Sequence, residues 1–195
     1  LQSNDTCRLI AEALRSGRLQ MRVPSFRVML AYQKWLEFEG AELDVQCPAI
    51  SPASMIETFQ PRGEGHFNIL RLLLVGAVGS GNKGHLWLLQ LLESALKDIP
   101  NDVVGVRPIR LQFAGLETAS YAALTRVVIK RAEELLGDQF TWHPASSKEQ
   151  IFQDMRQSNL LVNCSLKEAF SCVCSEAMAL GLPLLRIQNG GFEEQ

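Results

Sequence analysis

The sequence predicts an α/β protein with a doubly wound, Rossmann-like parallel sheet, and three observations support this fold class. From residue 69 onward, short apolar segments alternate with longer amphipathic ones, which is the pattern of strands followed by helices. The apolar segments are nearly continuous, as in strands covered on both faces. Glycine and proline stand between segments, where strands turn and helices end. Parallel neighbours need helical crossovers, so we expect five strands in the order 3-2-1-4-5.

The residues before this alternating region predict fewer elements. Phe26–Ala31 has the apolar and β-branched density of a strand, and Gln33–Glu39 is typical of a brief helix. Leu43–Cys47 alternates in polarity in the manner of a second strand. A proline-rich stretch follows, which is typical of a linker. We therefore expect an N-terminal remnant, a linker and an α/β domain, which cover residues 1–48, 49–66 and 67–195.

Five segments of the α/β domain predict strands because they are short, apolar and bounded by turn residues. The first is a near-continuous apolar run that only Arg71 interrupts. The predicted strands cover Ile69–Val75, Ile109–Ala114, Phe140–Trp142, Leu160–Asn163 and Pro183–Ile187.

Four segments between these strands predict helices. The first carries its leucines and alanines on one face. The third follows Ser147, a favourable N-cap residue, and the second and fourth run into Gly137 and Gly181, which suit the residue after a helix. The predicted helices cover Lys83–Leu96, Thr118–Leu136, Ser147–Arg156 and Ser171–Leu180.

Composition excludes several classes of function. The net charge of -2 and the pI near 6.0 provide no basic surface for a nucleic acid. No apolar run reaches the ~20 residues of a membrane-spanning helix and no signal peptide opens the chain, so we expect a cytoplasmic protein with at most a peripheral membrane association. The start at Leu1 and the Gly190-Gly191 turn near the end predict a piece of a longer protein.

The cysteines predict neither disulfides nor a metal site. Their number, five, and their irregular spacing do not fit a disulfide framework, which favours a reducing compartment. Cys172 and Cys174 lie two positions apart on a predicted helix, where side chains point to nearly opposite faces. We therefore expect small buried hydrophobes there and no bound metal.

The predicted strand order locates a ligand site. In the order 3-2-1-4-5 the winding reverses between the first and fourth strands, and ligands of such sheets bind beyond the carboxyl ends of the strands at that reversal. Two loops follow these strands, Gly76–Lys83 and Cys164–Phe170. We expect the two loops to form the binding site.

The first of these loops suits a phosphate. Gly76, Gly79 and Gly81 would let backbone amides approach an anion, and Lys83 adds an ammonium at the start of a helix. The glycine spacing fits neither a dinucleotide fingerprint nor a Walker loop. An ordinary strand-to-helix turn remains an alternative for this loop alone.

The second loop suits hydroxyl groups. Glu168 lies just before the predicted helix and Glu176 eight positions later, inside it. A carboxylate can accept two hydroxyl hydrogen bonds, as a sugar or a ribose requires, and the free amides of Phe170 and Ser171 suit phosphates. Taken singly, either glutamate could be a solvated surface charge.

The same region resembles a known family. The residues in register are Glu168, Phe170, Glu176, Ala177, Met178, Ala179, Gly181 and Pro183. In this order they resemble the C-terminal domain of retaining GT-B glycosyltransferases of family four, the group 1 glycosyl transferases. Gly76, the Lys83-Gly84 pair and Gly115 resemble glycine turns of the same family. Phe59 with Pro61 resembles its entry from the linker, and Gly190-Gly191 resembles its Gly-Gly turn. The resemblance covers about residues 26 to 194.

The resemblance implies an activity and roles for residues. Glu168 would contact the donor sugar hydroxyls, Glu176 the ribose hydroxyls, and Lys83 the leaving diphosphate, so that Glu168 and Lys83 are the catalytic candidates. From their place at the carboxyl end of a predicted strand, Trp142 and His143 would either border the nucleotide base or serve in packing. The other donor-binding residues implied are Gly76, Ala77, Gly79, Ala169, Phe170 and Ser171. The sugar would pass from a nucleoside diphosphate to a glycan or glycolipid hydroxyl with retention, without a metal or other cofactor, in polysaccharide or glycoconjugate synthesis.

The resemblance also implies domain roles. Residues 1–48 would be a remnant of the acceptor-side Rossmann domain, and 67–195 a nucleotide-sugar-binding domain truncated at its end. Because acceptor recognition belongs mainly to the N-terminal domain, we expect the fragment alone to be inactive.

Several departures from the family pattern suggest an alternative. Ala77 stands where the family usually has an arginine, and Ala169 and Ser171 replace glycines. We expect reduced or specialised activity, and a catalytically degenerate scaffold is the alternative. A nucleotide-sugar epimerase is disfavoured because Tyr121 lacks the lysine four positions later and has Thr125 instead.

Overall fold

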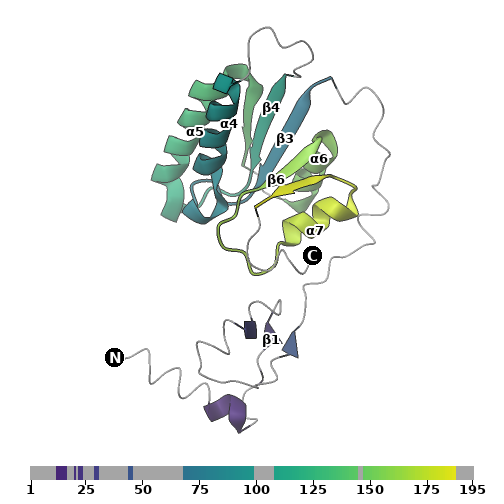
Figure 1. Ribbon diagram of the computed structural model, residues 1–195. Helices are drawn as coiled ribbons and strands as arrows, with labels where there is room; N and C mark the ends of the chain where they lie inside the picture. The colour runs from purple at the N-terminus through teal and green to yellow at the C-terminus, as the bar shows by residue number, and fades with distance from the viewer. Residues whose placement is uncertain are drawn as a thin grey trace. The chain divides into compact units, whose positions relative to one another are not determined.

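The structure, a computed structural model, describes residues 12–16, 20, 22–23, 29–30, 44–45, 68–98, 108–144 and 147–187. The chain forms two compact units. The smaller unit combines residues 1–50, 167–172 and 188–195, and the larger unit combines 51–166 and 173–187. The larger unit holds the main sheet (Figure 1).

The smaller unit contains a short parallel pair of strands. β1 (Arg22–Val23) pairs with β2 (Asp44–Val45), with Arg22 opposite Asp44. The strand predicted over Leu43–Cys47 is thus confirmed at its centre. The strand predicted over Phe26–Ala31 is wrong at Met29 and Leu30, which are helical, because a short apolar run of good helix formers has no periodicity that separates the two states. The helix predicted over Gln33–Glu39 lies outside the described residues.

The main sheet has five parallel strands in the order β5-β4-β3-β6-β7. Numbered along the chain within this sheet, the order is 3-2-1-4-5, which confirms the predicted topology. Their bounds are β3 Leu70–Val75, β4 Ile109–Ala114, β5 Phe140–His143, β6 Leu160–Asn163 and β7 Leu184–Arg186. The winding reverses between β3 and β6, which pair directly through Leu72↔Leu160 and Leu73↔Leu161.

Helices cover both faces of this sheet. α4 and α5 lie on one face and α6 and α7 on the other (Figure 1). The helices and helical turns are η2 Gly81–Lys83, α4 His85–Asp98, η3 Ala119–Tyr121, α5 Ala122–Leu136, η4 Gly137–Gln139, α6 Lys148–Gln157 and α7 Cys172–Ala179. As predicted, Ser147 caps α6, since its Oγ accepts a hydrogen bond from the Gln150 amide at 3.2 Å. Among the described residues, no helix is long and apolar enough to cross a membrane.

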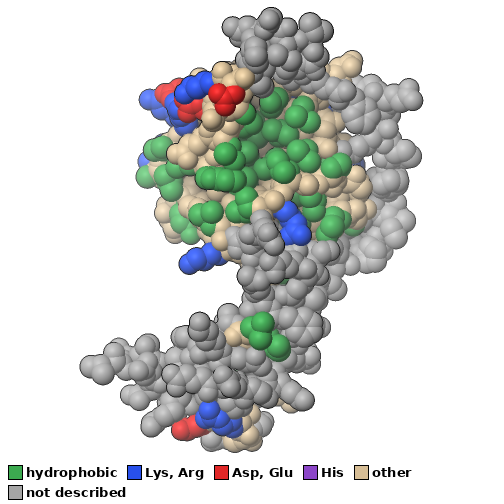
Figure 2. All heavy atoms as spheres, viewed as in Figure 1, with side chains coloured by type: hydrophobic (Ala, Val, Ile, Leu, Met, Phe, Trp, Pro, Cys, Tyr) green, Lys and Arg blue, Asp and Glu red, His purple; other side chains and the backbone are tan. Residues whose placement is uncertain are grey.

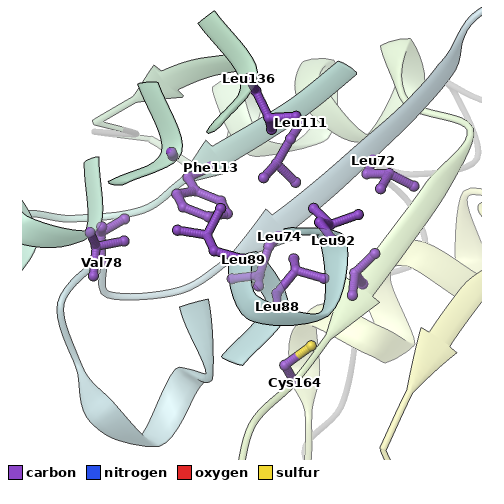
Figure 3. Packing of buried hydrophobic residues seen from close by; sticks show 13 residues of the cluster. Leu72, Leu74, Val78, Leu88, Leu89, Leu92, Leu111, Phe113, Leu136 and Cys164 are labelled. Carbon is purple, nitrogen blue, oxygen red and sulfur yellow. The ribbon is translucent and has the colours of Figure 1, made fainter. Parts of the chain in front are cut away.

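The core lies between the sheet and the α4–α5 layer (Figure 3). Side chains alternate along β3, so Leu72 and Leu74 join this cluster while the fully buried Leu73 points to the other face. Phe113 of β4 stands at the centre, with its ring 4.8 Å from that of His85 and 5.1 Å from that of Phe140, both edge to face. This packing fixes the start of α4 against the sheet.

The outer face of α4 and α5 keeps several apolar side chains exposed. Figure 2 shows hydrophobic side chains spread over this view of the larger unit, beside a cluster of acidic and basic groups. Exposed apolar residues of these two helices are Leu86, Trp87, Leu91, Leu96, Leu124 and Val127. An ion pair between Arg131 of α5 and Glu93 of α4, at 2.5 Å, joins the two helices.

Candidate functional site

The glycine-rich loop after β3 packs against α5. Val78 is fully buried and belongs to the core (Figure 3). Its carbonyl accepts a hydrogen bond of 2.6 Å from Thr125 Oγ1. Gly79 has φ +85, and a Cβ there would lie 2.5 Å from Thr125 Oγ1 and 2.6 Å from the Thr125 amide. Only glycine can take this conformation at this distance from the helix, so α5 fixes the loop.

Lys83 lies over the beginning of the same loop. It ends the turn η2, and its amide donates a hydrogen bond of 3.1 Å to the Ser80 carbonyl. A Cβ on Gly76 would lie 3.1 Å from Lys83 Cγ, so the aliphatic stem of Lys83 packs on Gly76. Ala77, the next residue after Gly76, is half-buried and adds no charge to the loop. The structure therefore brings Gly76, Gly79 and Lys83 together in one loop.

The loops after β3 and β6 meet at the point where the winding reverses. The Leu166 amide donates a hydrogen bond of 2.7 Å to the Asn82 carbonyl. Gly84, with φ +71, approaches the β6 loop so closely that a Cβ would lie 2.2 Å from the Cys164 carbonyl oxygen. The left-handed Gly84 also separates η2 from α4, which is why α4 begins at His85 and not at Lys83 as predicted.

The buried Asn163 shapes the loop after β6. Its Oδ1 accepts a hydrogen bond of 3.0 Å from the Ser165 amide, and its Nδ2 donates to Cys174 Sγ at 3.3 Å. An asparagine that bonds the amide two residues on holds a tight turn. Asn163 thereby links the end of β6 to α7, a role that sequence reasoning missed.

The Glu176 side chain on α7 is buried and forms an ion pair with Lys148. Its Oε1 accepts a hydrogen bond of 2.6 Å from Lys148 Nζ, at the start of α6. The interpretation of Glu176 as an ordinary solvated helix residue is wrong, because that side chain is shielded from water. Lys148 was not predicted, since an exposed lysine 28 residues away leaves no local signal.

The other predicted residues of this segment lie between β6 and α7. Glu168 and Phe170 are half-buried, Ala169 is exposed and Ser171 is buried. α7 begins at Cys172, one residue after Ser171, so Phe170 and Ser171 stand directly before the helix as expected. Their roles stay predictions.

Trp142 and His143 lie at the carboxyl end of β5. Trp142 packs against the core cluster, and its indole nitrogen is buried without a hydrogen-bond partner among the described residues. His143 is half-exposed, and its Nδ1 lies 3.2 Å from Asp154 Oδ1 and 2.9 Å from Gln112 Nε2. Of the two, only His143 has a polar ring that reaches the surface.

Two titratable groups beside the loops are shifted by burial. Burial and then the neighbouring Lys83 ammonium lower the pKa of His85 to about 4, so this ring is neutral at neutral pH. Burial raises the pKa of the Cys164 thiol to about 11. The prediction that Cys172 and Cys174 are both buried is wrong for Cys172, which is exposed while Cys174 is buried, because the two positions of α7 face apart. In the part of the chain that the structure describes, no three His, Cys, Asp or Glu side chains cluster as metal ligands do.

The fold is that of the GT-B glycosyltransferases. The chain is similar to a glycosyltransferase from Rickettsia africae ESF-5, with a TM-score of 0.72 and 17% identity, over 90% of this chain and 46% of that one. It is also similar to Anabaena HepE in complex with UDP and glucose, with a TM-score of 0.64 and 19% identity, over 98% of this chain and 50% of that one.

Residues 70–195 match the family model "Glycosyl transferases group 1", and the chain belongs to this family. A curated relative is the D-inositol 3-phosphate glycosyltransferase of Mycolicibacterium smegmatis, 32% identical over 85 residues, which are 43% of this chain and 20% of the relative. The chain thus spans about half the length of its solved relatives and a fifth of this curated one.

Proposed function

We propose that the protein transfers a sugar, a hexose in the simplest case, from a nucleoside diphosphate to an acceptor hydroxyl with retention. The observation that carries the proposal is a buried carboxylate, Glu176, in the helix that follows β6, since the loop after β6 also contacts the Gly76–Lys83 loop. Membership of the group 1 glycosyl transferases supports the reaction class. The solved complex of Anabaena HepE with UDP and glucose supports a nucleotide-sugar donor.

In this mechanism the chain supplies charge and orientation. Lys83 and the amides of the glycine-rich loop would stabilise the diphosphate as it leaves, which is where negative charge develops. Glu176 would accept the ribose hydroxyls, and Glu168 the hydroxyls of the donor sugar. These groups suffice to hold the donor, so the proposal includes no metal and no other cofactor.

The acceptor in the proposal is a glycan or glycolipid, and the role is polysaccharide or glycoconjugate synthesis. Among the described residues, the carboxyl edge of the main sheet carries a lysine, glycine amides and carboxylates, which suit the nucleotide-sugar donor. An acceptor pocket would be supplied by the N-terminal half of the enzyme, so residues 67–195 alone would bind the donor without transferring its sugar.

Calorimetric titration with a panel of nucleoside diphosphates tests the proposal. We expect micromolar binding of one of them, and we expect Lys83→Ala to weaken it at least tenfold, because an ion pair to a phosphate is lost. Lys130→Ala is the matched control, since Lys130 is an exposed lysine of α5 that forms a surface ion pair of 3.8 Å with Glu134. Equal effects of the two variants on nucleotide affinity would show that Lys83 does not bind the diphosphate.

One observation favours a second function. Ala77 places a methyl group where the family usually has an arginine, so the loop carries Lys83 as its cation and no second one between Gly76 and Lys83. A catalytically degenerate domain that serves as a scaffold would show no binding across the nucleotide panel. In that case Ala77→Arg is expected to restore measurable binding, because the variant returns the second cation to the loop.

A further inference from the structure

The pair of Glu176 and Lys148 is unusually asymmetric in exposure. The Glu176 side chain is 7% exposed, whereas that of Lys148 is 70% exposed. The two groups come from different helices, α7 and α6, and meet at 2.6 Å. The contact compensates the buried Glu176 carboxylate for lost hydration, whereas most of the Lys148 side chain stays in water.

A buried carboxylate needs such a partner. Removal of an ionised carboxylate from water is costly unless hydrogen bonds and an opposite charge replace the lost hydration. Lys148 supplies both through Oε1. A carboxylate has about four acceptor positions on its two oxygens, so one lysine bond leaves acceptor positions for two hydroxyl groups.

The start of α6 holds Lys148 at a fixed point. Ser147 caps the helix through the Gln150 amide, so the backbone of Lys148, the first residue of α6, is ordered. α6 follows β5 and α7 follows β6, so both helices begin at the carboxyl edge of the parallel sheet, where ligands bind. Glu176 lies in the first turns of α7. Lys148 therefore approaches Glu176 at the edge that carries the two site loops.

We infer that Lys148 is a positioning residue, which holds the Glu176 carboxylate in the orientation that accepts the two ribose hydroxyls of the donor nucleotide. This inference rests on the proposed function, in which Glu176 contacts the ribose. Lys148 stays on Oε1 while the ribose binds, and it does not itself touch the nucleotide. Without Lys148 the Glu176 carboxylate turns toward other hydrogen-bond donors of the protein or solvent, and the protein loses its preference for a ribose over a deoxyribose.

The test compares UDP with 2′-deoxy-UDP by calorimetry in four proteins: the wild type, Lys148→Met, Lys148→Arg and the control Lys130→Met. We expect the wild type to prefer UDP roughly tenfold, the value of one hydrogen bond to a charged group. Lys148→Met is expected to lower this ratio to about one, and Lys148→Arg to restore it, because the guanidinium can reach the same oxygen. Lys130→Met keeps the wild-type ratio.

Two outcomes overturn the inference. An unchanged preference in Lys148→Met would make Lys148 a surface charge without a role in the site, and tighter UDP binding would make it a competitor of the ribose. Lys148→Gln repeats the test with a polar side chain if Lys148→Met does not fold. Failure of the wild type to bind UDP or any other nucleoside diphosphate would instead reject the proposed function, which separates the two conclusions.

Discussion

The Leu166 amide donates a hydrogen bond of 2.7 Å to the carbonyl of Asn82, although the two residues belong to loops 84 positions apart. This bond closes the edge of the sheet where β3 and β6 are neighbours and the winding changes direction. It ties the loop that carries Lys83 to the segment that leads into α7. A change in the packing of either loop should therefore affect the whole of the proposed donor site.

Gly84→Ala should disrupt this junction. The added Cβ would lie 2.2 Å from the Cys164 carbonyl oxygen, and the alanine backbone would have to adopt φ +71. We therefore expect a loss of about 3 kcal/mol in the free energy of unfolding and no nucleotide binding. Gly137→Ala is the control for backbone strain alone: its φ is +56 and its ψ -125, but no atom lies within 4 Å of the new Cβ, so a loss of about 2 kcal/mol is expected from the backbone conformation. Chemical denaturation measures both. Similar losses would show that the contact with Cys164 does not matter.

Thr125→Val tests how α5 holds the glycine-rich loop. The variant keeps the shape of the side chain but removes the hydrogen bond of 2.6 Å to the buried Val78 carbonyl. We expect a loss of about 1–2 kcal/mol in stability, because the carbonyl remains buried without a partner, and weaker nucleotide binding through a displaced loop. Thr141→Val, at an exposed position of β5, should change neither quantity. Unaltered nucleotide affinity in Thr125→Val would mean that the loop keeps its shape without this bond.

The strands were predictable because their signal is local. Ile109–Ala114 and Leu160–Asn163 match the observed bounds of β4 and β6, since buried parallel strands are written as continuous apolar runs. Helix starts were less accurate. α5 begins at Ala122 because residues 119–121 form a 3-10 turn, and such a turn has the same apolar pattern as the first turn of a helix.

The candidate site was predictable only in part. Glu176 and Lys83 stand out because a carboxylate and an ammonium follow strands at the reversal of winding. Lys148 could not be found, because its pairing with Glu176 depends on how α6 packs beside α7. Trp142 shows the opposite limit: its place at a strand end is compatible with base contact and with packing alike, and its packing against the core cluster is a tertiary property.

Cysteine labelling reports on the start of α7. Cys172 is exposed, whereas Cys164 and Cys174 are buried and burial raises the pKa of Cys164 to about 11, so iodoacetamide should modify Cys172 first among these three. Because Cys172 follows the residues expected to bind phosphate, saturating nucleoside diphosphate should slow its modification several-fold. Peptide mass spectrometry resolves each site. Faster labelling of Cys164 in the native protein would contradict the packing of the loop after β6.

His85 should make stability fall in mild acid. Its pKa is about 4 in the folded protein and 6.5 when unfolded, so between these values the unfolded state binds the proton and the folded state does not. Stability is therefore unaffected by this group above pH 7, falls as the pH drops through 6.5, and has lost about 2 kcal/mol at pH 5.

His85→Leu isolates this contribution. The leucine fills most of the same space against Phe113 and cannot take a proton. Between pH 7.5 and pH 5 the free energy of unfolding of the variant should therefore fall by about 2 kcal/mol less than that of the wild type. Urea denaturation at both pH values measures the difference, and the carboxylates common to the two proteins cancel. Parallel pH profiles would show that the His85 ring is solvated in the folded protein, and with it that the start of α4 is not packed on β4 as described.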